Sequence, residues 1–190
     1  MGILLLLALS VWSAPSVAQT DDPNRAHPAP GTKIVRFGQL DEGIYRGSTP
    51  KKDADFRFLQ SLGVKYILDL TYHPLLTKLQ KRRAKRYGIV LIPVIMNASP
   101  IAPSQKHVNQ ALMILRDRRF HPIYLQCDYG RDRTGVIAGL YLIYFKGMSP
   151  EEAWQDMKHY GFKEYWYLRG LKAYFRKHSQ RRPAFADPAQ

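Results

Sequence analysis

The sequence predicts an α/β fold in which a central, mainly parallel and twisted sheet carries helices on both faces. Short apolar runs typical of buried strands alternate with longer amphipathic stretches typical of helices along most of the 190 residues. The clearest unit is residues 122–146, where an apolar run, a glycine-containing loop and an apolar helix follow one another. In such sheets the loop lies at the carboxyl end of a central strand.

The first elements expected are two short strands at residues 33–37 and 43–46, with a hairpin turn over residues 38–42. Asp53 is expected to cap the first helix, with Gly63 just past its end. Strands and helices then alternate. They are expected at residues 64–70 (strand), 75–87 (helix), 89–95 (strand), 104–116 (helix), 123–125 (strand) and 134–146 (helix).

The end of the chain carries strong helix-boundary signals. Gly147 suits the left-handed residue after a helix, and Ser149-Pro150-Glu151-Glu152 fits a capping box with proline at the first helical position. The aromatic and basic segment 153–177 is then expected to pack on the core.

The amino-acid composition limits the kinds of partner and the size of the core that can be expected. The formal net charge is +14 and the pI is about 10.0, so the surface should attract phosphorylated small molecules, lipid head groups or nucleic acid. Cys127 is the single cysteine, which excludes an internal disulfide. The hydrophobic fraction of 45% suffices for one domain with a substantial core.

The expected organisation is a signal peptide at residues 1–18, a flexible linker at 19–32, the domain at 33–178 and a frayed tail at 179–190. The apolar run 3–9 is too short to span a bilayer, and small residues precede the expected cleavage site. An uncleaved anchor is the alternative. The chain is therefore expected to be exported, either periplasmic or secreted, with its thiol free.

The loop of residues 127–134 is predicted to form an anion-binding site, called here the anion cradle. Its backbone N–H groups and the dipole of the following helix create positive potential at one point. Cys127 at the start of the loop lies in a field that favours a thiolate, and Arg133 can return to the same anion with a planar fork. The hydroxyl of Thr134 can donate to the sulfur when it leaves phosphorus.

These residues resemble the C-x5-R-[ST] loop of cysteine-dependent phosphatases, the protein tyrosine and dual-specificity family. The G-R-D-R-T-G ending is most similar to the G-K-D-R-T-G form of bacterial members and of relatives that accept phosphoinositides, and residues 44–50 resemble the family's Y-R-S-x-x-P entry. The resemblance spans roughly residues 33–177. It implies the dual-specificity phosphatase fold and hydrolysis of phosphate monoesters through a phosphocysteine, without metal or other cofactor. Cys127 would be the nucleophile, Arg133 the phosphoryl binder and Thr134 the aid to the leaving thiolate.

The chain departs from the family's pattern at two places. Gln126 stands where the family has His before the cysteine, and residues 88–116, which include the usual general-acid loop, hold no Asp or Glu. The remaining nearby carboxylates are Asp128, expected to point away from the mouth, and Asp132. Asp132 is predicted to be either the general acid or an anchor for the loop.

Four loop residues are predicted to bind substrate: Asp128, Tyr129, Gly130 and Arg131. Arg131 and the basic helix 75–87 favour inositol polyphosphates or phosphoinositides, with phosphopeptides as the rival substrate. The basic helix is read either as a docking surface for a polyanion or as a solvated face. An anionic membrane surface is a further expected partner, and the chain is expected to be monomeric.

Two other readings stay open: a catalytically inactive phosphate-binding module, suggested by Gln126 and the missing acid, and a basic nucleic-acid binder. The leader and the lack of a recognised motif argue against nucleic acid. Outside the loop, Arg46 is predicted to form a structural ion pair, with a place facing the phosphate pocket as the alternative. His73 is predicted to be a loop or cap residue, with a catalytic role as the alternative.

Overall fold

The structure is a computed structural model that describes residues 27–71, 73–97, 99–181 and 183–186. The expected signal peptide, residues 19–26 of the predicted linker and residues 187–190 of the predicted tail lie outside the described residues. No helix among the described residues is both long and apolar enough to cross a membrane.

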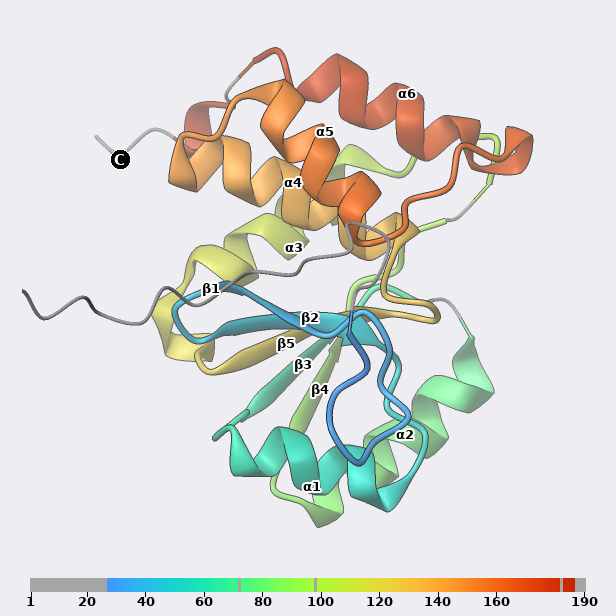
Figure 1. Cartoon of the computed structure of the whole chain (residues 1–190), viewed down its shortest axis with the longest axis vertical. Coiled ribbons are helices and arrows are strands. Elements are labelled where there is room, and N and C mark those ends of the chain that lie inside the picture. The colour runs from blue at the N-terminus through green and yellow to red at the C-terminus, as the bar shows by residue number, and fades with distance from the viewer. Residues whose placement is uncertain (1–26, 72, 98, 182, 187–190) are drawn as a thin grey trace, which may run out of the picture.

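Within the described residues, five strands form one sheet, in the order β1-β2-β5-β3-β4 (Figure 1). The β1–β2 pair is antiparallel, and the other three pairs are parallel. The mainly parallel sheet predicted from the sequence is therefore confirmed. The strands are β1 (Gly38–Asp41), β2 (Ile44–Ser48), β3 (Tyr66–Asp69), β4 (Val90–Pro93) and β5 (Ile123–Cys127).

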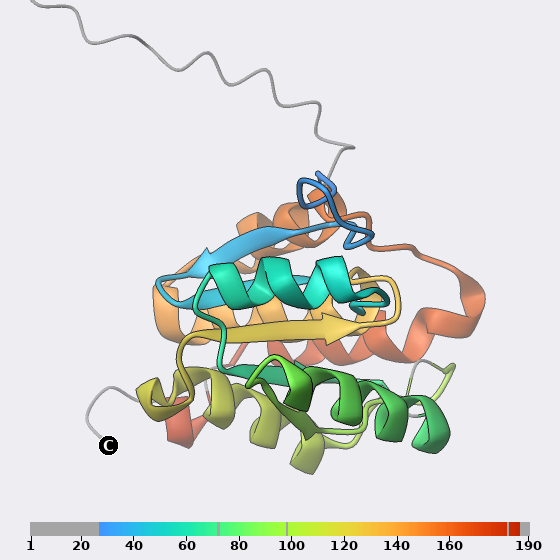
Figure 2. The same cartoon turned by 90° about the horizontal axis from the view of Figure 1, so that it is seen from below.

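Helices cover both faces of the sheet, as predicted (Figures 1 and 2). On one face lie α1 (Asp53–Ser61) and α2 (Pro74–Arg86). On the other face lie the remaining helices. They are α3 (Gln105–Arg116), α4 (Asp132–Lys146), α5 (Pro150–His159) and α6 (Arg169–His178), with short 3-10 helices at η1 (Arg118–Phe120), η2 (Trp166–Leu168) and η3 (Ala184–Ala186).

Each face has its own hydrophobic cluster, and β5 contributes to both. Tyr124 points into the cluster under α1 and α2, whereas Ile123 and Leu125 point into the cluster under α3 to α6. All five residues of β5 are buried, which explains why its sequence is a continuous apolar run apart from Gln126.

The opening hairpin differs from the prediction. Residues 38–41, expected in the turn, form β1, and residues 33–37, expected as a strand, form a loop against the core. Ile34 is fully buried there and Arg36 has φ +55, a left-handed conformation that ends any extended run. The strand prediction for 33–37 was wrong because apolar residues in an anchored loop imitate a strand pattern.

The predicted cap of α1 was also wrong. The N-cap is Lys52, and Asp55 at the third helical position accepts hydrogen bonds from the backbone N–H groups of Lys51 and Lys52, at 2.7 and 2.9 Å. Asp53 instead pairs with Arg86 of α2 at 3.2 Å. The other boundary signals are confirmed, because Gly147 has φ +72 after α4 and Ser149 caps α5 in a capping box.

The packed chain extends beyond the predicted limits of the domain. Ala29 is buried in the α1–α2 cluster, and the backbone N–H of Phe37 donates to the His27 carbonyl, so residues 27–32 are not a free linker. At the other end Ala186 is buried and Arg116 donates to the carbonyl of Phe185. Phe185 and Ala186 of the predicted frayed tail are therefore held against the domain.

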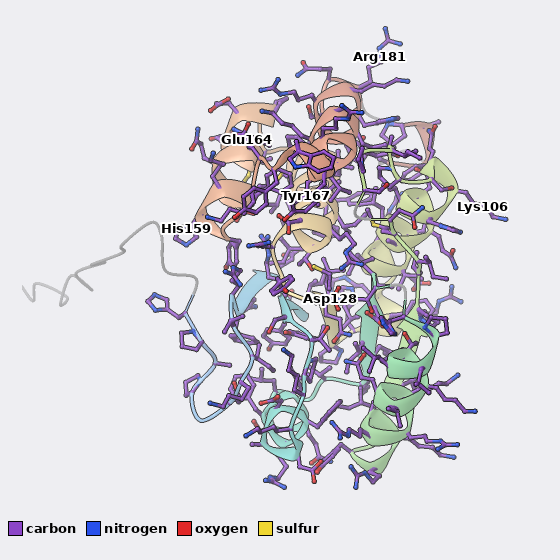
Figure 3. All side chains as sticks on the ribbon, turned by 90° about the vertical axis from the view of Figure 1, so that its right-hand side faces the viewer. Lys106, Asp128, His159, Glu164, Tyr167 and Arg181 are labelled. Carbon is purple, nitrogen blue, oxygen red and sulfur yellow. The ribbon has the colours of Figure 1, made fainter. Side chains whose placement is uncertain are left out.

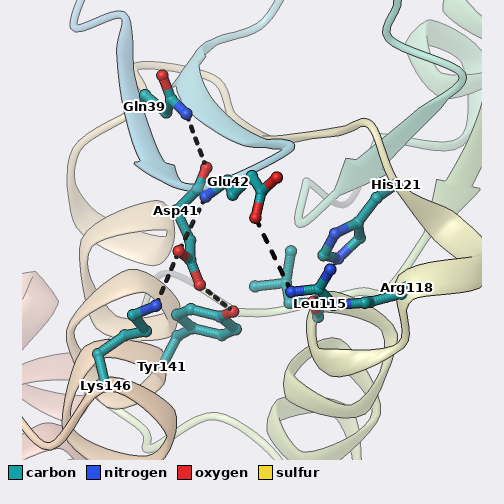
Figure 4. A network of polar contacts seen from close by, with 8 residues as sticks. All are labelled: Gln39, Asp41, Glu42, Leu115, Arg118, His121, Tyr141 and Lys146. Carbon is teal, nitrogen blue, oxygen red and sulfur yellow. Dashed lines mark hydrogen bonds and ion pairs between the residues drawn. The ribbon is translucent and has the colours of Figure 1, made fainter.

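A polar network fixes the β1–β2 turn to the far end of α4 (Figure 4). The carboxylate of Asp41 accepts from the Tyr141 hydroxyl and the Lys146 ammonium, both at 2.9 Å. In the same network Arg118 approaches Glu42 at 3.9 Å. The hairpin is thus held to the helix that begins at the cysteine loop.

Arg46 forms the structural ion pair that the sequence predicted. Its side chain is fully buried, its guanidinium lies 2.6 Å from Asp156 of α5, and it stacks 3.7 Å above the Tyr160 ring. Two of its nitrogens, Nε and Nη2, have no hydrogen-bond partner among the described residues. Asp156 therefore compensates the buried charge of Arg46.

Replacing Asp156 with Ala should cost about 3 kcal/mol of unfolding free energy, because it leaves a buried guanidinium unpaired. Urea unfolding measures this cost. Gln155→Ala, on the exposed side of the same helix, is the control and should cost less than about 0.5 kcal/mol. The double variant Arg46→Met/Asp156→Leu should recover most of the loss, and equal losses in the single and double variants would contradict the assignment.

Candidate active site

The cysteine loop connects β5 to α4 at the carboxyl end of the parallel strands. Cys127 is the last residue of β5, pairs in register with Ser48 of β2 and is only 2% exposed. Its carbonyl oxygen accepts from the backbone N–H groups of Gly130 and Thr49, both at 3.1 Å. The sulfur-bearing residue is therefore held by the loop it begins and by the segment after β2.

Two glycines let this loop close against the sheet. Gly130 has φ +66, and a Cβ at this position would lie 2.3 Å from the backbone carbon of Gly47. A Cβ on Gly47 would lie 2.3 Å from the hydroxyl of Tyr124, which donates to the Ser48 carbonyl at 2.7 Å. The structure thus gives Gly130, predicted to bind substrate, a conformational role.

Arg133 folds back from the first turn of α4 toward the loop. Its Nη2 pairs with the Asp128 carboxylate, and Nη1 lies 3.5 Å from the carbonyl oxygen of Leu70. Asp128 was expected to point away from the mouth, but its half-exposed side chain instead binds Arg133 and lines the neighbouring pocket. Figure 3 shows Asp128 on the face turned to the viewer, between the upper helices and α2.

Asp132 makes the contacts of an anchor. It is 7% exposed, and one carboxylate oxygen accepts from Arg131 Nε at 2.8 Å while the other accepts from the Lys163 backbone N–H at 3.1 Å. These bonds tie the start of α4 to the segment after α5. The guanidinium of Arg131 also lies over the rings of Tyr129 and Tyr165, at 4.9 and 5.9 Å.

Buried polar atoms near the loop have no hydrogen-bond partner within the part of the chain that the structure describes. They include the hydroxyl oxygens of Thr134, in the first turn of α4, and Thr49, beside the Cys127 carbonyl. Unsatisfied buried hydroxyls are costly and uncommon in native proteins, so each of them calls for an explanation. Thr134 is the residue for which the sequence predicted a role toward the sulfur.

Gln126 belongs to a polar cluster that the sequence did not reveal. Its side-chain amide exchanges two hydrogen bonds of 3.1 Å with the amide of Gln80, which is buried on α2. Asp69, its register partner on β3, accepts from the N–H and hydroxyl of Thr71 at 3.0 and 2.7 Å. Burial raises the pKa of Asp69. Hydrogen bonds from Thr71 and Gln126 lower this pKa, but by less than burial raises it.

A pocket of 620 Å³ adjoins the cysteine loop between α2 and the segments that follow β2 and β3. Asp128 and Tyr129 of the loop line one side, and Leu76 and Leu79 of α2 line the other. The remaining walls are mostly polar or cationic. They include Thr49, Lys51, Thr71, His73, Gln80 and Arg83. His73 is the N-cap of α2, as predicted, and its side chain makes no capping hydrogen bond.

The basic helix α2 is partly engaged with its neighbours. Arg83 donates to the Lys51 carbonyl at 2.6 Å, and Arg86 pairs with Asp53. No other basic side chain of α2 forms an ion pair within the described ranges. The basic residues of α2 without an ion pair of this kind include Lys78, Lys81, Arg82 and Lys85. Among the described residues, no group of three or more His, Cys, Asp or Glu side chains is arranged to hold a metal ion.

This arrangement is that of cysteine-dependent phosphatases, whose nucleophile and phosphate-binding arginine share one loop between a central strand and a helix. Residues 32–145 match the model of the tyrosine phosphatase family, and the chain belongs to that family. The family resemblance seen in the sequence is therefore confirmed.

The curated relatives include inositol diphosphatases and dual specificity phosphatases. Inositol diphosphatase DSP3 of Arabidopsis thaliana is 31% identical over 125 residues, which cover 65% of this chain and 60% of that protein. Dual specificity protein phosphatase TpbA of Pseudomonas aeruginosa is 24% identical over 167 residues, which cover 86% of this chain and 67% of that protein. The chain thus spans about three-fifths of the length of the plant relative.

Solved structures support the same fold. The catalytic domain of the PP-IP phosphatase SIW14 from S. cerevisiae superposes with a TM-score of 0.64 at 23% identity, covering 75% of this chain and 84% of that one. P. aeruginosa TpbA superposes with a TM-score of 0.63 at 22% identity, covering 80% of this chain and 88% of that one. At this identity the likeness shows the fold.

Asp69→Asn should stabilise the protein at neutral pH. Because the folded-state pKa of Asp69 lies above its unfolded value, the folded protein binds more protons between the two values, and stability falls as pH rises through them. Asn keeps an oxygen acceptor for Thr71. Because Asn does not ionise, it avoids the free-energy cost of a buried negative charge. Urea unfolding at about pH 3.5 and about pH 7 should show a gain only at the higher pH.

Asp41→Asn is the control of opposite sign. Burial tends to raise the pKa of Asp41, but hydrogen bonds from Lys146, the Glu42 N–H and Tyr141 outweigh burial and lower it. Its stabilising contribution is therefore present at neutral pH and lost in acid, so Asp41→Asn should destabilise mainly at about pH 7. A pH-independent effect of Asp69→Asn would contradict the assigned ionisation.

Proposed function

We propose that this protein hydrolyses phosphate monoesters or diphosphates through a covalent phosphocysteine on Cys127, without a metal ion. The thiolate attacks phosphorus, the S–P bond forms and the bond from phosphorus to the leaving oxygen breaks. Water then attacks the phosphocysteine, the S–P bond breaks and inorganic phosphate leaves. The observation that carries the proposal is the loop in which Arg133 folds back toward the residue that follows Cys127.

Each residue of the loop has a separate role in the proposed phosphoryl transfer. When substrate binds, Arg133 leaves Asp128 and its planar guanidinium donates hydrogen bonds to the equatorial phosphoryl oxygens. The backbone N–H groups of the loop and of the first turn of α4 donate to the same oxygens. The buried hydroxyl of Thr134, which has no partner among the described residues, donates to the sulfur as it leaves. Asp132 and Arg131 hold the loop through their mutual ion pair.

Asp128 is our candidate for the general acid. Both oxygens of Asp132 already accept hydrogen bonds, from Arg131 and from Lys163, so a proton-donating role would require those bonds to break. Asp128 has an exposed side chain at the pocket that adjoins the loop, and it loses its partner when Arg133 turns to the phosphate. A leaving oxygen in that pocket would lie beside its carboxyl group.

The substrate class that fits best is an inositol diphosphate or polyphosphate. Lys51 and Arg83 place positive charge at the pocket. The exposed cations Lys78, Lys81, Arg82 and Lys85 extend this charge along α2. The plant relative is named an inositol diphosphatase. A phosphopeptide is the second candidate, because Leu76, Leu79 and Tyr129 give the pocket an apolar wall for a phenol ring.

We further propose that the protein is exported and acts outside the cytoplasm, which rests on the leader-like residues 1–18. Its single thiol is then free of disulfide partners in an oxidising compartment. Contact of the α2 face with an anionic membrane surface and a monomeric state stay predictions from the sequence.

Cys127→Ser should abolish phosphate release and preserve the fold, because a serine hydroxyl is not ionised at neutral pH while the anion cradle remains. The measurement is metal-free phosphate release from an aryl phosphate, inositol polyphosphates, phosphoinositides and phosphopeptides. Thermal unfolding with and without inorganic phosphate checks that the variant folds and still binds the anion. A variant with a tenth of wild-type turnover would contradict the phosphocysteine, and an inactive wild type that binds phosphate would favour the binding module.

Asp128→Asn and Asp132→Asn should separate the general acid from the anchor. Loss of the acid should slow an alkyl phosphate by roughly 10²-fold, and should slow an aryl phosphate with a good leaving group much less. Loss of the anchor should slow both substrates alike, because the loop is displaced. If Asp132→Asn shows the selective loss and Asp128→Asn does not, Asp132 is the acid.

A further inference from the structure

Arg36 is the one described residue other than glycine that has a positive φ. A left-handed backbone costs a residue with a Cβ roughly 1 kcal/mol or more, and such strain concentrates at functional sites. The neighbours of Arg36 enforce this conformation. The Val35 N–H donates to the Ser48 side chain at 2.9 Å and its carbonyl accepts from the Ser48 N–H at 3.0 Å, while Ile34 and Phe37 pack in the core.

The strained backbone directs the guanidinium of Arg36 onto the cysteine loop. Its Nη1 donates to the carbonyl oxygen of Tyr129 at 3.1 Å, across 93 positions of sequence. Space for the side chain comes from Gly161, where an added Cβ would lie 3.0 Å from Arg36 Nε. The contact therefore ties the loop of residues 33–37 to the cysteine loop.

The contacted peptide group is central to the shape of the loop. The Tyr129 carbonyl and the Gly130 N–H belong to one peptide plane, and that N–H donates to the Cys127 carbonyl at 3.1 Å. Arg36 therefore holds one end of the plane and Cys127 the other. The orientation of this plane fixes where the following residues of the loop begin.

The charge of Arg36 is also felt in the site. Burial and the neighbouring Arg131 lower the pKa of Arg36, whereas Asp132 and Cys127 raise it. The cation of Arg36 therefore lies beside the cysteine loop, where positive charge attracts an anionic ligand. Gln126, the residue before the cysteine, is neutral, and Arg36 supplies a positive charge from another element of the fold.

We propose that Arg36 is a positioning residue of the active site, which holds the cysteine loop in its anion-binding shape and adds positive charge to it. This role rests on the proposed phosphoryl transfer at Cys127. It acts through the loop, since Arg36 binds a backbone carbonyl and leaves the phosphoryl oxygens to Arg133. It explains why a strained arginine occupies a position that Asn or Gly would fill at lower cost.

The test uses Arg36→Asn, Arg36→Lys and the control Lys33→Gln. Asn adopts the left-handed conformation readily, so the first variant keeps the backbone and removes the contact and the charge. Lys33 is an exposed cation in the same segment, and its backbone N–H donates to the Asp55 carboxylate. Cys127 is the sole cysteine, so intact mass reports its alkylation by neutral iodoacetamide at pH 7.

Arg36→Asn should slow alkylation about tenfold and should raise, by a similar factor, the inorganic phosphate concentration that half-protects Cys127. Its thermal midpoint should equal or exceed that of the wild type, because the strain is relieved. Arg36→Lys keeps the positive charge but loses the planar guanidinium. Its alkylation rate and its half-protecting phosphate concentration should lie between those of the wild type and of Arg36→Asn. Lys33→Gln should match the wild type in all three measurements.

Alkylation and phosphate protection need no turnover, so they test Arg36 even if the wild type hydrolyses none of the phosphates tried. Unchanged alkylation and unchanged phosphate protection in Arg36→Asn would overturn the proposal. A lower thermal midpoint in Arg36→Asn would also overturn it, because Arg36 would then serve the fold. Absence of turnover in a wild type that passes the Arg36 tests would overturn the proposed function alone.

Discussion

The cysteine loop can take its shape only because backbone meets backbone where it touches β2. A Cβ on Gly130 would overlap the backbone of Gly47, and a Cβ on Gly47 would overlap the hydroxyl of Tyr124. With both side chains absent, the loop lies against the end of β2, the Cys127 carbonyl reaches Thr49, and the Tyr124 hydroxyl reaches Ser48. The positions of Arg133 and Thr134 follow, since α4 begins directly after the loop.

The parts of this design with local causes could be predicted from the sequence. The strand, loop and helix around Cys127 are consecutive, so apolar runs, a glycine and a helix start suffice to indicate them. The same holds for Gly147 and for the capping box at Ser149. The hairpin was misplaced because the conformation of Arg36 is set by contacts with Ser48 and the core, which no local pattern reports.

The supporting side chains of the site come from distant elements, and their pairing could not be read from spacing. Gln80 meets Gln126 across 46 positions, and Arg36 meets Tyr129 across 93. A signal for Asp69 was present, because an acidic residue ends an otherwise apolar strand. Only the register of β3 against β5 identifies Gln126 as its neighbour.

The strand order has a consequence for how the chain is made. β5 lies between β2 and β3, but it is synthesised after all the other strands. Ile44 cannot meet Ile123, its partner in register, until most of the chain has left the ribosome, and pairings so distant in sequence form slowly. Until then β2 and β3 each have an open edge and the nascent chain cannot close its sheet. The unpaired strand edges therefore stay available to other chains until β5 has been made.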